Sequence, residues 1–188
     1  MKLAAAFSIF LLISFFASTK LFSQIITEKK NTMDSSNQQV ISNFYTCFQN
    51  KNYQGMQDCY ADNATFSDPV FINLNASQVK KMWEMLCVRG KDLKLDFKNI
   101  QTSGNHGSAM WIAYYTFSAT GRKVVNHVTA SFIIENGKIV KHTDVFSFYK
   151  WSRQAFGITG SLIGWTPFFK KKLRQGAMKS LNEFSKKK

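Results

Sequence analysis

Three side chains that could exchange protons lie on either side of one turn signal: His127, His142 and Asp144. The signal is Asn136-Gly137, the strongest short predictor of a β-hairpin with a two-residue type I′ turn. Counting outward from that turn pairs Thr129 with Asp144 and His127 with Phe146. Because side chains alternate between the two faces of a strand, His127, Thr129, His142 and Asp144 should then share one face. Imidazole and carboxylate groups placed together could act as general acid and base.

This polar face has two interpretations. It could be the solvated side of the sheet, which is common in antiparallel sheets. It could also be the wall of a pocket, because Ile133, Val140, Phe146 and Phe148 fall on the same face. Apolar walls with a few convergent polar groups are typical of small-molecule sites.

The surrounding pattern predicts one α+β domain over residues 38–151. A helix begins near Ser35 or Ser36 and ends before Asn50, a second covers 53–60, and a third begins after Ser77. A short extended stretch runs from 64 to 71. Four strands then follow, over Leu93–Thr102, Ala109–Ala119, Lys123–Ile134 and Lys138–Lys150. This order predicts a curved antiparallel sheet with the N-terminal helices packed on its concave side.

The composition is strongly basic. With 188 residues, 18 of them Phe, the chain can bury a core of its own as one domain. Its formal charge is +14, much of it from a basic end that contains Lys170, Lys171, Lys172, Arg174, Lys179 and Lys186–Lys188. Such an end suits acidic lipid or an acidic partner, or is a solvated helix face. Nucleic acid is not expected, because no binding motif is recognisable.

The first 23 residues are typical of a signal peptide. Lys2 precedes an apolar run from Leu3 to Ala17, a suitable length for a signal peptide and short for a membrane span of about 20 residues. The cleavage site is blurred, so an uncleaved anchor is the alternative. Both interpretations predict an exported protein, periplasmic or secreted, with possible membrane association. Residues 24–37 are polar and are predicted to form a linker.

The cysteines, Cys47, Cys59 and Cys87, are odd in number. An oxidising compartment would permit one disulfide and leave one thiol, whereas their apolar neighbours favour small buried core residues. Their spacing matches no metal-site pattern. We expect neither a metal nor a cofactor.

Two segments resemble a known superfamily. Tyr60–Val70 (YADNATFSDPV) resembles the segment that enters the sheet in nuclear transport factor 2-like proteins, closest to ketosteroid isomerases and SnoaL-like proteins. Asn136–Asp144 (NGKIVKHTD) is similar to the hairpin of SnoaL-like cyclases and limonene epoxide hydrolases. The resemblance covers Val40 to about Trp151 and implies a cone-shaped sheet around a small-molecule pocket. It specifies the fold better than the reaction, because the superfamily includes enzymes, binding modules and scaffolds.

The resemblance also implies catalytic roles. Asp68 falls on the isomerase base, a carboxylate that shuttles a proton between carbons of an enolisable ketone. Its alternative role is to cap the turn at Pro69. Asp144 falls on one of two catalytic acids of the hydrolases. Together with His127 and His142 it could also supply the His and Asp of SnoaL-like cyclases.

Other family positions are changed. The oxyanion-hole Tyr and Asp of the isomerases look like Phe44 and Thr129 here, and the Arg-x-Asp of the hydrolases looks replaced by Ala113-Tyr114-Tyr115. Ordinary steroid isomerisation is therefore not expected, because lost oxyanion donors are costly. We expect the ligand to contact Phe44, Trp83, Tyr115, Thr129 and Phe146.

The extension over residues 152–188 lies beyond the resemblance. Thr166 and Pro167 can start a helix whose apolar stripe is Phe169, Leu173, Ala177, Leu181 and Phe184. This basic amphipathic helix could lie on an anionic membrane, fold back over the pocket mouth or the sheet, or pack in a homodimer. The predicted function is acid–base chemistry of the isomerase, cyclase or hydrolase type on an apolar or amphipathic small molecule. The alternative is a non-catalytic ligand-binding or dimerisation module of the cell envelope.

Overall fold

The structure is a computed structural model that describes the backbone of residues 2–186 and the side chains of residues 20–186. The side chains of the predicted signal-peptide run, Leu3–Ala17, lie outside the described residues, as do Lys187 and Lys188. Within residues 20–186, no helix is both long enough and apolar enough to cross a membrane.

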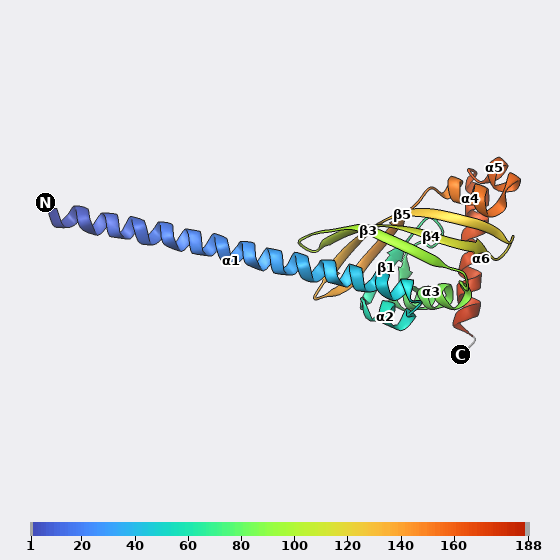
Figure 1. The fold of residues 1–188 in the computed structure, drawn as a ribbon, viewed down its shortest axis with the longest axis horizontal. Helices are drawn as coiled ribbons and strands as arrows, with labels where there is room; N and C mark the ends of the chain where they lie inside the picture. Colours follow the sequence, from blue (N-terminus) through green and yellow to red (C-terminus); the bar gives the residue numbers. More distant parts are fainter. Residues whose placement is uncertain (1, 187–188) are drawn as a thin grey trace.

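The described chain alternates helices and strands around one sheet (Figure 1). Its helices are α1 (Lys2–Gln49), α2 (Tyr53–Asp58), α3 (Ala76–Arg89), α4 (Phe148–Phe156), α5 (Ile158–Ile163) and α6 (Pro167–Ser185). Its strands are β1 (Tyr60–Ser67), β2 (Leu74–Asn75), β3 (Lys94–Ser103), β4 (His106–Phe117), β5 (Arg122–Glu135) and β6 (Lys138–Val145).

The six strands form a single sheet in the order β2-β1-β6-β5-β4-β3. All neighbouring pairs are antiparallel except β1 and β6, which run parallel. The C-terminal part of α1, together with α2 and α3, packs on the inner face of the curved sheet (Figure 1). The predicted α+β class, curved sheet and helix placement are confirmed, with one parallel pair that the sequence did not indicate.

The core lies between this inner face and the helices. Phe44 of α1 and Trp83 of α3 are buried against Phe132 of β5 and Ile139 of β6. Phe44 contacts the rings of Trp83 and Phe132 edge-on, at centroid distances of 5.4 and 6.4 Å. Aromatic packing therefore fixes α1 and α3 on the sheet, as the high Phe content suggested.

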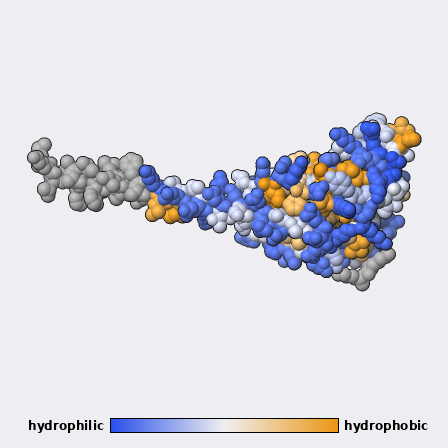
Figure 2. Space-filling model, viewed as in Figure 1, coloured by the Kyte–Doolittle hydropathy of each residue, from blue (hydrophilic) through white to orange (hydrophobic). Residues whose placement is uncertain are grey.

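The segment predicted to be a linker, residues 24–37, is helical and continues α1 without a break. It contains neither Gly nor Pro, and the hydroxyls of Thr27 and Thr32 bond back to the carbonyls of Ser23 and Glu28. Its side chains are nevertheless exposed up to Ser36, apart from the half-buried Asp34, and its surface is largely hydrophilic in Figure 2. Polarity indicated exposure correctly here, but an exposed segment without helix breakers can still be helical.

The predicted register of the β5–β6 hairpin is wrong beyond its first residues. Glu135 pairs with Lys138 as expected, and Ile134 pairs with Ile139. Ile133 then pairs with Lys141, so Val140 is one extra residue on β6, a β-bulge. One extra residue turns every later side chain of β6 to the opposite face relative to β5.

The bulge separates the residues that the simple register had placed together. Asp144 lies opposite Ala130 instead of Thr129, and His142 lies opposite Phe132. Both acid–base residues of β6 therefore point into the core. His127 and Thr129 of β5 are exposed on the outer face instead.

The last predicted strand is also too long, because β6 ends at Val145. The hydroxyl of Ser147 accepts a hydrogen bond from the Lys150 backbone N–H and caps α4 at 3.3 Å. Helix α6 then folds back along α3, where Leu181 is buried in the core and Arg89 donates a hydrogen bond to the Ser180 hydroxyl at 2.6 Å. The stripe predicted on α6 thus packs on its own domain.

Candidate functional site

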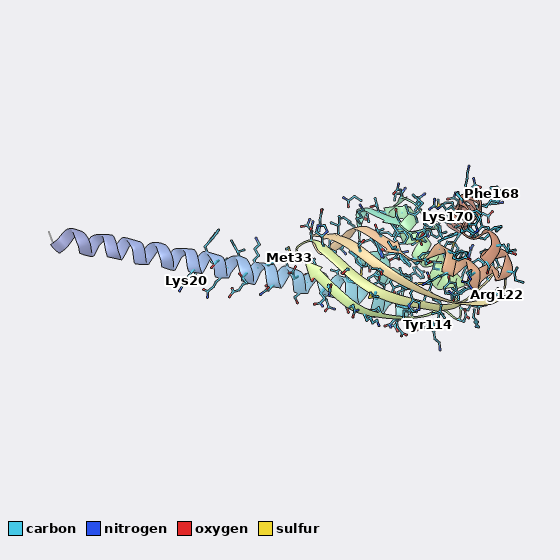
Figure 3. All side chains as sticks on the ribbon, turned by 90° about the horizontal axis from the view of Figure 1, so that it is seen from above. Lys20, Met33, Tyr114, Arg122, Phe168 and Lys170 are labelled. Atoms are coloured by element: carbon cyan, nitrogen blue, oxygen red, sulfur yellow. The ribbon has the colours of Figure 1, made fainter. Side chains whose placement is uncertain are left out.

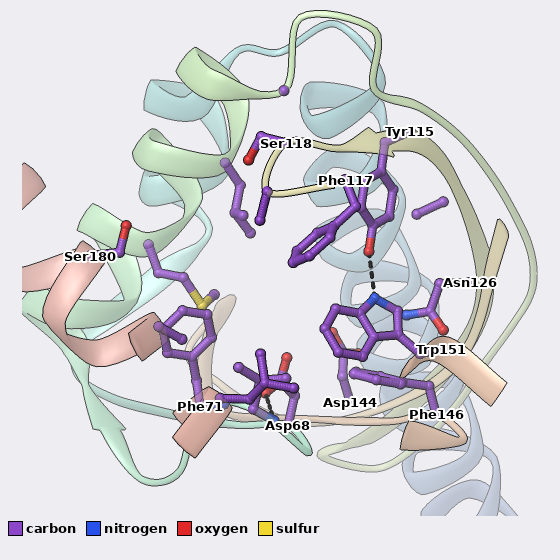
Figure 4. A pocket seen from close by; sticks show the side chains of 18 of the residues that line it. Asp68, Phe71, Tyr115, Phe117, Ser118, Asn126, Asp144, Phe146, Trp151 and Ser180 are labelled. Carbon is purple, nitrogen blue, oxygen red and sulfur yellow. Dashed lines mark hydrogen bonds between the residues drawn. The ribbon is translucent and has the colours of Figure 1, made fainter. Parts of the chain in front are cut away.

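A cavity of about 780 Å³ lies between the inner face of the sheet, α3 and the C-terminal helices. Its walls are mostly apolar, and Phe71, Phe117 and Phe146 point into it in Figure 4. Its polar side chains include Asp68, Tyr115, Asn126 and Asp144. A small apolar molecule with one or two oxygen atoms suits such a lining.

Asp144 is held at the cavity wall by two N–H donors. Its Oδ1 accepts hydrogen bonds from Nε2 of His142 at 3.0 Å and from Nε1 of Trp111 at 3.3 Å. Both Asp144 and His142 are almost completely buried, with 3% and 0% of their surface exposed. The carboxylate is therefore fixed in position, and a fixed group needs little reorganisation when a ligand binds.

The hydrogen bonds behind Asp144 define the tautomer of His142. Trp83 can only donate, so its Nε1–H donates to the Tyr60 hydroxyl oxygen, at 2.9 Å. The Tyr60 O–H then donates to Nδ1 of His142, at 2.6 Å. With that arrangement, a neutral His142 carries its proton on Nε2 and donates it to Asp144. The chain Trp83–Tyr60–His142–Asp144 is satisfied with a neutral imidazole.

Asp68 lies just after β1 and also lines the cavity. Its Oδ1 accepts hydrogen bonds from the backbone N–H groups of Val70 at 2.7 Å and Phe71 at 2.5 Å, the Asx turn expected before a proline. Burial raises the pKa of Asp68 to about 7; the two backbone hydrogen bonds oppose this shift, and the nearby charge of Asp144 adds to it. Within the described residues no hydrogen bond engages Oδ2, so this oxygen is available to a ligand.

Tyr115 supplies a hydroxyl on the opposite wall. Its oxygen accepts a hydrogen bond from Nε1 of Trp151 at 2.7 Å (Figure 4). Burial raises its pKa, and the charge of Asp68 raises it further, so the phenol keeps its proton near neutral pH. That proton can be donated to a ligand oxygen.

The structure brings five of the nine predicted site residues to the cavity: Asp68, Trp83, Tyr115, Asp144 and Phe146. His142 does not line the cavity; it lies behind Asp144 and is hydrogen-bonded to it. Phe44 is buried in the core beside His142, at a centroid distance of 5.5 Å. His127 and Thr129 face the outside of the sheet because of the bulge, so neither lines the cavity.

Sequence reasoning missed Tyr60, Trp111 and Trp151. The pattern predicts Tyr60 at the end of the preceding helix, whereas it begins β1. Alternation in β1 does not reveal its burial, because the register shifts between Tyr60 and Thr65 and Asp62 is exposed. Nothing local indicates the Trp111 and Trp151 contacts, which join residues 33 and 36 positions apart.

Among the side chains of residues 20–186, no group of three His, Cys, Asp or Glu residues is arranged to hold a metal ion. Cys47, Cys59 and Cys87 are free thiols, with Cys87 buried and the other two partly buried. The polar chemistry available in the cavity is thus that of carboxylates, a phenol, an amide, hydroxyls and the cations Arg89 and Lys172.

Comparison of the whole fold with solved structures finds distant relatives. An LEH-like epoxide hydrolase of M. tuberculosis superposes with a TM-score of 0.54 at 13% identity, over 65% of this chain and 90% of its own. IdmH of Streptomyces antibioticus, provisionally assigned as a polyketide cyclase, gives 0.54 at 16% over 63% and 96%. TerC, co-crystallised with polyporic acid, gives 0.56 at 14% over 64% and 98%. At these identities the likeness is one of fold alone.

The sequence itself also identifies the family. No curated protein matches the chain significantly in sequence. The model of the SnoaL-like domain, however, matches residues 41–142, more than half of the chain. This range contains the last turns of α1, helices α2 and α3, and the sheet as far as His142 of β6. The chain therefore belongs to the SnoaL-like domain family.

Proposed function

We propose that this protein is an acid–base enzyme that moves a proton at a carbon next to a carbonyl group of an apolar or amphipathic small molecule. The observation that carries the proposal is the meeting of Asp68 and Tyr115 in one apolar cavity, with Asp144 fixed beside them. A base with a pKa of about 7 is suited to take up and return a proton near neutral pH.

Each polar group has a role in this mechanism. Oδ2 of Asp68 removes a proton from the carbon and leaves an enolate. Tyr115 donates its O–H to the enolate oxygen and so stabilises the charge that develops there. Asp68 then returns the proton to a different carbon, which is isomerisation. Alternatively, the enolate carbon attacks a second carbonyl of the same molecule, and the alkoxide formed from that carbonyl takes the proton from Asp68, which is ring closure. Asp144 accepts a hydrogen bond from a ligand hydroxyl, and its charge adds to the rise that burial causes in the pKa of Asp68.

The comparisons support a small-molecule function. The proteins of similar fold include a hydrolase, a provisionally assigned cyclase and a protein co-crystallised with polyporic acid. Epoxide hydrolysis fits this chain less well, because Ala113 and Tyr115 stand where the resemblance places the hydrolase Arg and Asp. Proton transfer at carbon needs only the groups already in the cavity.

A direct test measures deuterium incorporation next to the carbonyl of 2-tetralone in D₂O by NMR. We expect the wild-type protein to accelerate exchange, with a rate that rises with pH and levels off above about 7, where Asp68 is ionised. Asp68→Asn should reduce the rate by roughly 100-fold or more, in the range of a lost general base. Asp62→Asn is the control, since the Asp62 carboxylate is fully exposed at the surface.

Two results would contradict the proposal. Exchange by Asp68→Asn at the wild-type rate would remove Asp68 from the mechanism. Saturable quenching of tryptophan fluorescence by apolar ketones without any exchange would favour a non-catalytic binding protein of the cell envelope.

We also propose that the protein is exported, on the strength of the apolar run Leu3–Ala17 behind Lys2. N-terminal sequencing of protein recovered from the periplasm or medium tests this, and a chain found whole in the cytoplasm would contradict it.

A further inference from the structure

Four large apolar side chains of α5, the turn after it and the start of α6 are more exposed than their neighbour Ile163, which is 40% exposed. Ile158, Leu162, Trp165 and Phe168 are 81%, 67%, 69% and 66% exposed. Together they form what we call the docking face. Figure 2 shows the apolar patch over α5, bordered by hydrophilic residues, and Figure 3 shows Phe168 pointing outward beside Lys170. A contiguous exposed patch of this kind indicates an interaction surface.

The docking face is distinct from the apolar stripe of α6. Leu173, Leu181 and their neighbours on the stripe are turned inward, where they pack in the two apolar clusters of the domain. The exposed side chains belong to a corner between α5 and α6 that internal hydrogen bonds hold in place. Trp165 donates its Nε1–H to the Leu162 carbonyl at 3.0 Å, and the Thr166 hydroxyl caps α6. Apolar side chains that are held exposed to water cost free energy unless a partner covers them.

The segment of the chain that forms the docking face carries charges of one sign. From residue 145 to 182 the sequence contains no Asp or Glu, and its basic residues are Lys150, Arg153, Lys170, Lys171, Lys172, Arg174 and Lys179. Arg174 is used internally, where it donates to the Pro69 carbonyl. Lys172 lies over the Phe168 ring at 5.3 Å, so a cation borders the apolar tips directly. Apolar side chains bordered by lysines fit the interface of a bilayer that contains anionic lipid.

The same corner borders the cavity. Ile163, Phe168 and Lys172 line it, together with Leu173 and Gly176 of α6. We propose that α5 and the first turn of α6 dock on an anionic membrane surface, and that the apolar ligand enters the cavity from the bilayer at this corner. The docking proposal rests only on the properties of this surface. The proposed route of the ligand rests on the proposed function. The inward-facing stripe of α6 takes no part in docking.

Trp165 gives a local test with the full-length protein. The apolar run at the N-terminus could itself bring the chain to vesicles, so sedimentation is not sufficient. Trp83, Trp111 and Trp151 are buried, whereas Trp165 is exposed, and brominated phospholipid quenches only tryptophans that enter the bilayer. We expect vesicles of phosphatidylcholine with 30% phosphatidylglycerol, carrying bromine on the acyl chains, to quench the emission. Trp165→Phe should lose this quenching.

Leu162→Asp and Val88→Asp form a matched pair, since both replace exposed aliphatic side chains on helices. Leu162→Asp should raise the lipid concentration for half-maximal quenching by about tenfold or more, because a leucine leaves the interface and a negative charge enters it. Val88→Asp should leave it unchanged. Pure phosphatidylcholine or 1 M salt should weaken quenching, because both remove the electrostatic attraction.

Unquenched wild-type Trp165, or equal effects of the two substitutions, would overturn the docking proposal. The exchange of 2-tetralone is measured without vesicles, so its failure and the failure of docking can be told apart. If the protein shows normal quenching but no exchange, the docking proposal stands and the proposed chemistry is wrong.

Discussion

At Asp68, stability and the proposed chemistry oppose each other. Its pKa is raised to about 7 in the folded state, above the value of about 3.9 in an unfolded chain. Between these two values the folded state binds more protons, so folding stability falls as pH rises from about 4 to about 7. The contribution is complete below the unfolded pKa and is lost above the folded one. A base with a raised pKa therefore lowers the stability of the protein at pH values where Asp68 is ionised.

We therefore expect Asp68→Asn to stabilise the protein relative to wild type more at pH 8 than at pH 4. Asn keeps an Oδ1 acceptor for the backbone N–H groups of Val70 and Phe71 but cannot ionise. The upper limit of the difference is about 4 kcal/mol, from three pKa units, and the partial exposure of Asp68 lowers it. Urea unfolding at both pH values measures it. Equal effects at the two pH values would mean that the pKa of Asp68 is not raised.

Two buried tyrosines provide a contrast in hydrogen bonding. The Tyr60 hydroxyl links Trp83 to His142, whereas the Tyr45 hydroxyl is buried with no hydrogen-bond partner among the described residues. Tyr60→Phe should destabilise the fold by about 1–3 kcal/mol, because it leaves a buried donor and a buried acceptor unpaired. Tyr45→Phe should be neutral or stabilising by up to about 1 kcal/mol, since it removes an unpaired group. Equal losses of stability in chemical unfolding would contradict the assigned network.

At the level of elements, the β5–β6 hairpin shows what the sequence could specify and what it could not. The turn at Asn136-Gly137 and the pairing of Glu135 with Lys138 follow from local chemistry. The bulge at Val140 does not, because Ile139, Val140 and Lys141 suit either register locally. Burial of Phe132 and His142 on the same inner face selects the bulged register, and that packing involves α1 and α3 as well. Long-range packing therefore decided which side His142 and Asp144 face.

The helices show the same division. The cap at Thr166 with Pro167 predicted the start of α6 correctly, since capping is local. Where α6 would pack could not be deduced, because its stripe suits any apolar surface. The sequence therefore did not predict that α6 forms a wall of the cavity, or that Phe168 and Leu173 line it.

Two glycines of the C-terminal helices should respond in opposite ways to alanine. A Cβ at Gly160 would collide with the backbone of Ser152 in α4, whereas a Cβ at Gly176 in α6 would meet no atom within 4 Å. Gly160→Ala should therefore separate α4 from α5 and cost about 1–3 kcal/mol. Gly176→Ala should stabilise α6 by roughly 0.5–1 kcal/mol. Thermal unfolding distinguishes them, and a Gly160→Ala protein as stable as wild type would show that the α4–α5 corner packs differently.

At the scale of the whole molecule, the outer face of the sheet and the docking face are separate surfaces. Tyr114 points away from the outer face, on the side of the molecule opposite Phe168 and Lys170 (Figure 3). Met110, Tyr114, Val125 and Val145 are all exposed there. These apolar side chains lie among exposed polar ones, His127 and Thr129 included, and we expect a second copy of the chain to pair on this mixed face, the dimerisation alternative of the sequence.

We expect Tyr114→Glu to shift the protein from dimer to monomer in native mass spectrometry, because like charges would face each other across a two-fold interface. Since the docking face lies on the other side, the substitution should leave the quenching of Trp165 by brominated lipid unchanged. Leu162→Asp should do the reverse, keeping the dimer and losing the quenching. A single substitution that abolished both would mean that one surface serves both contacts, and the two-sided arrangement would have to be abandoned.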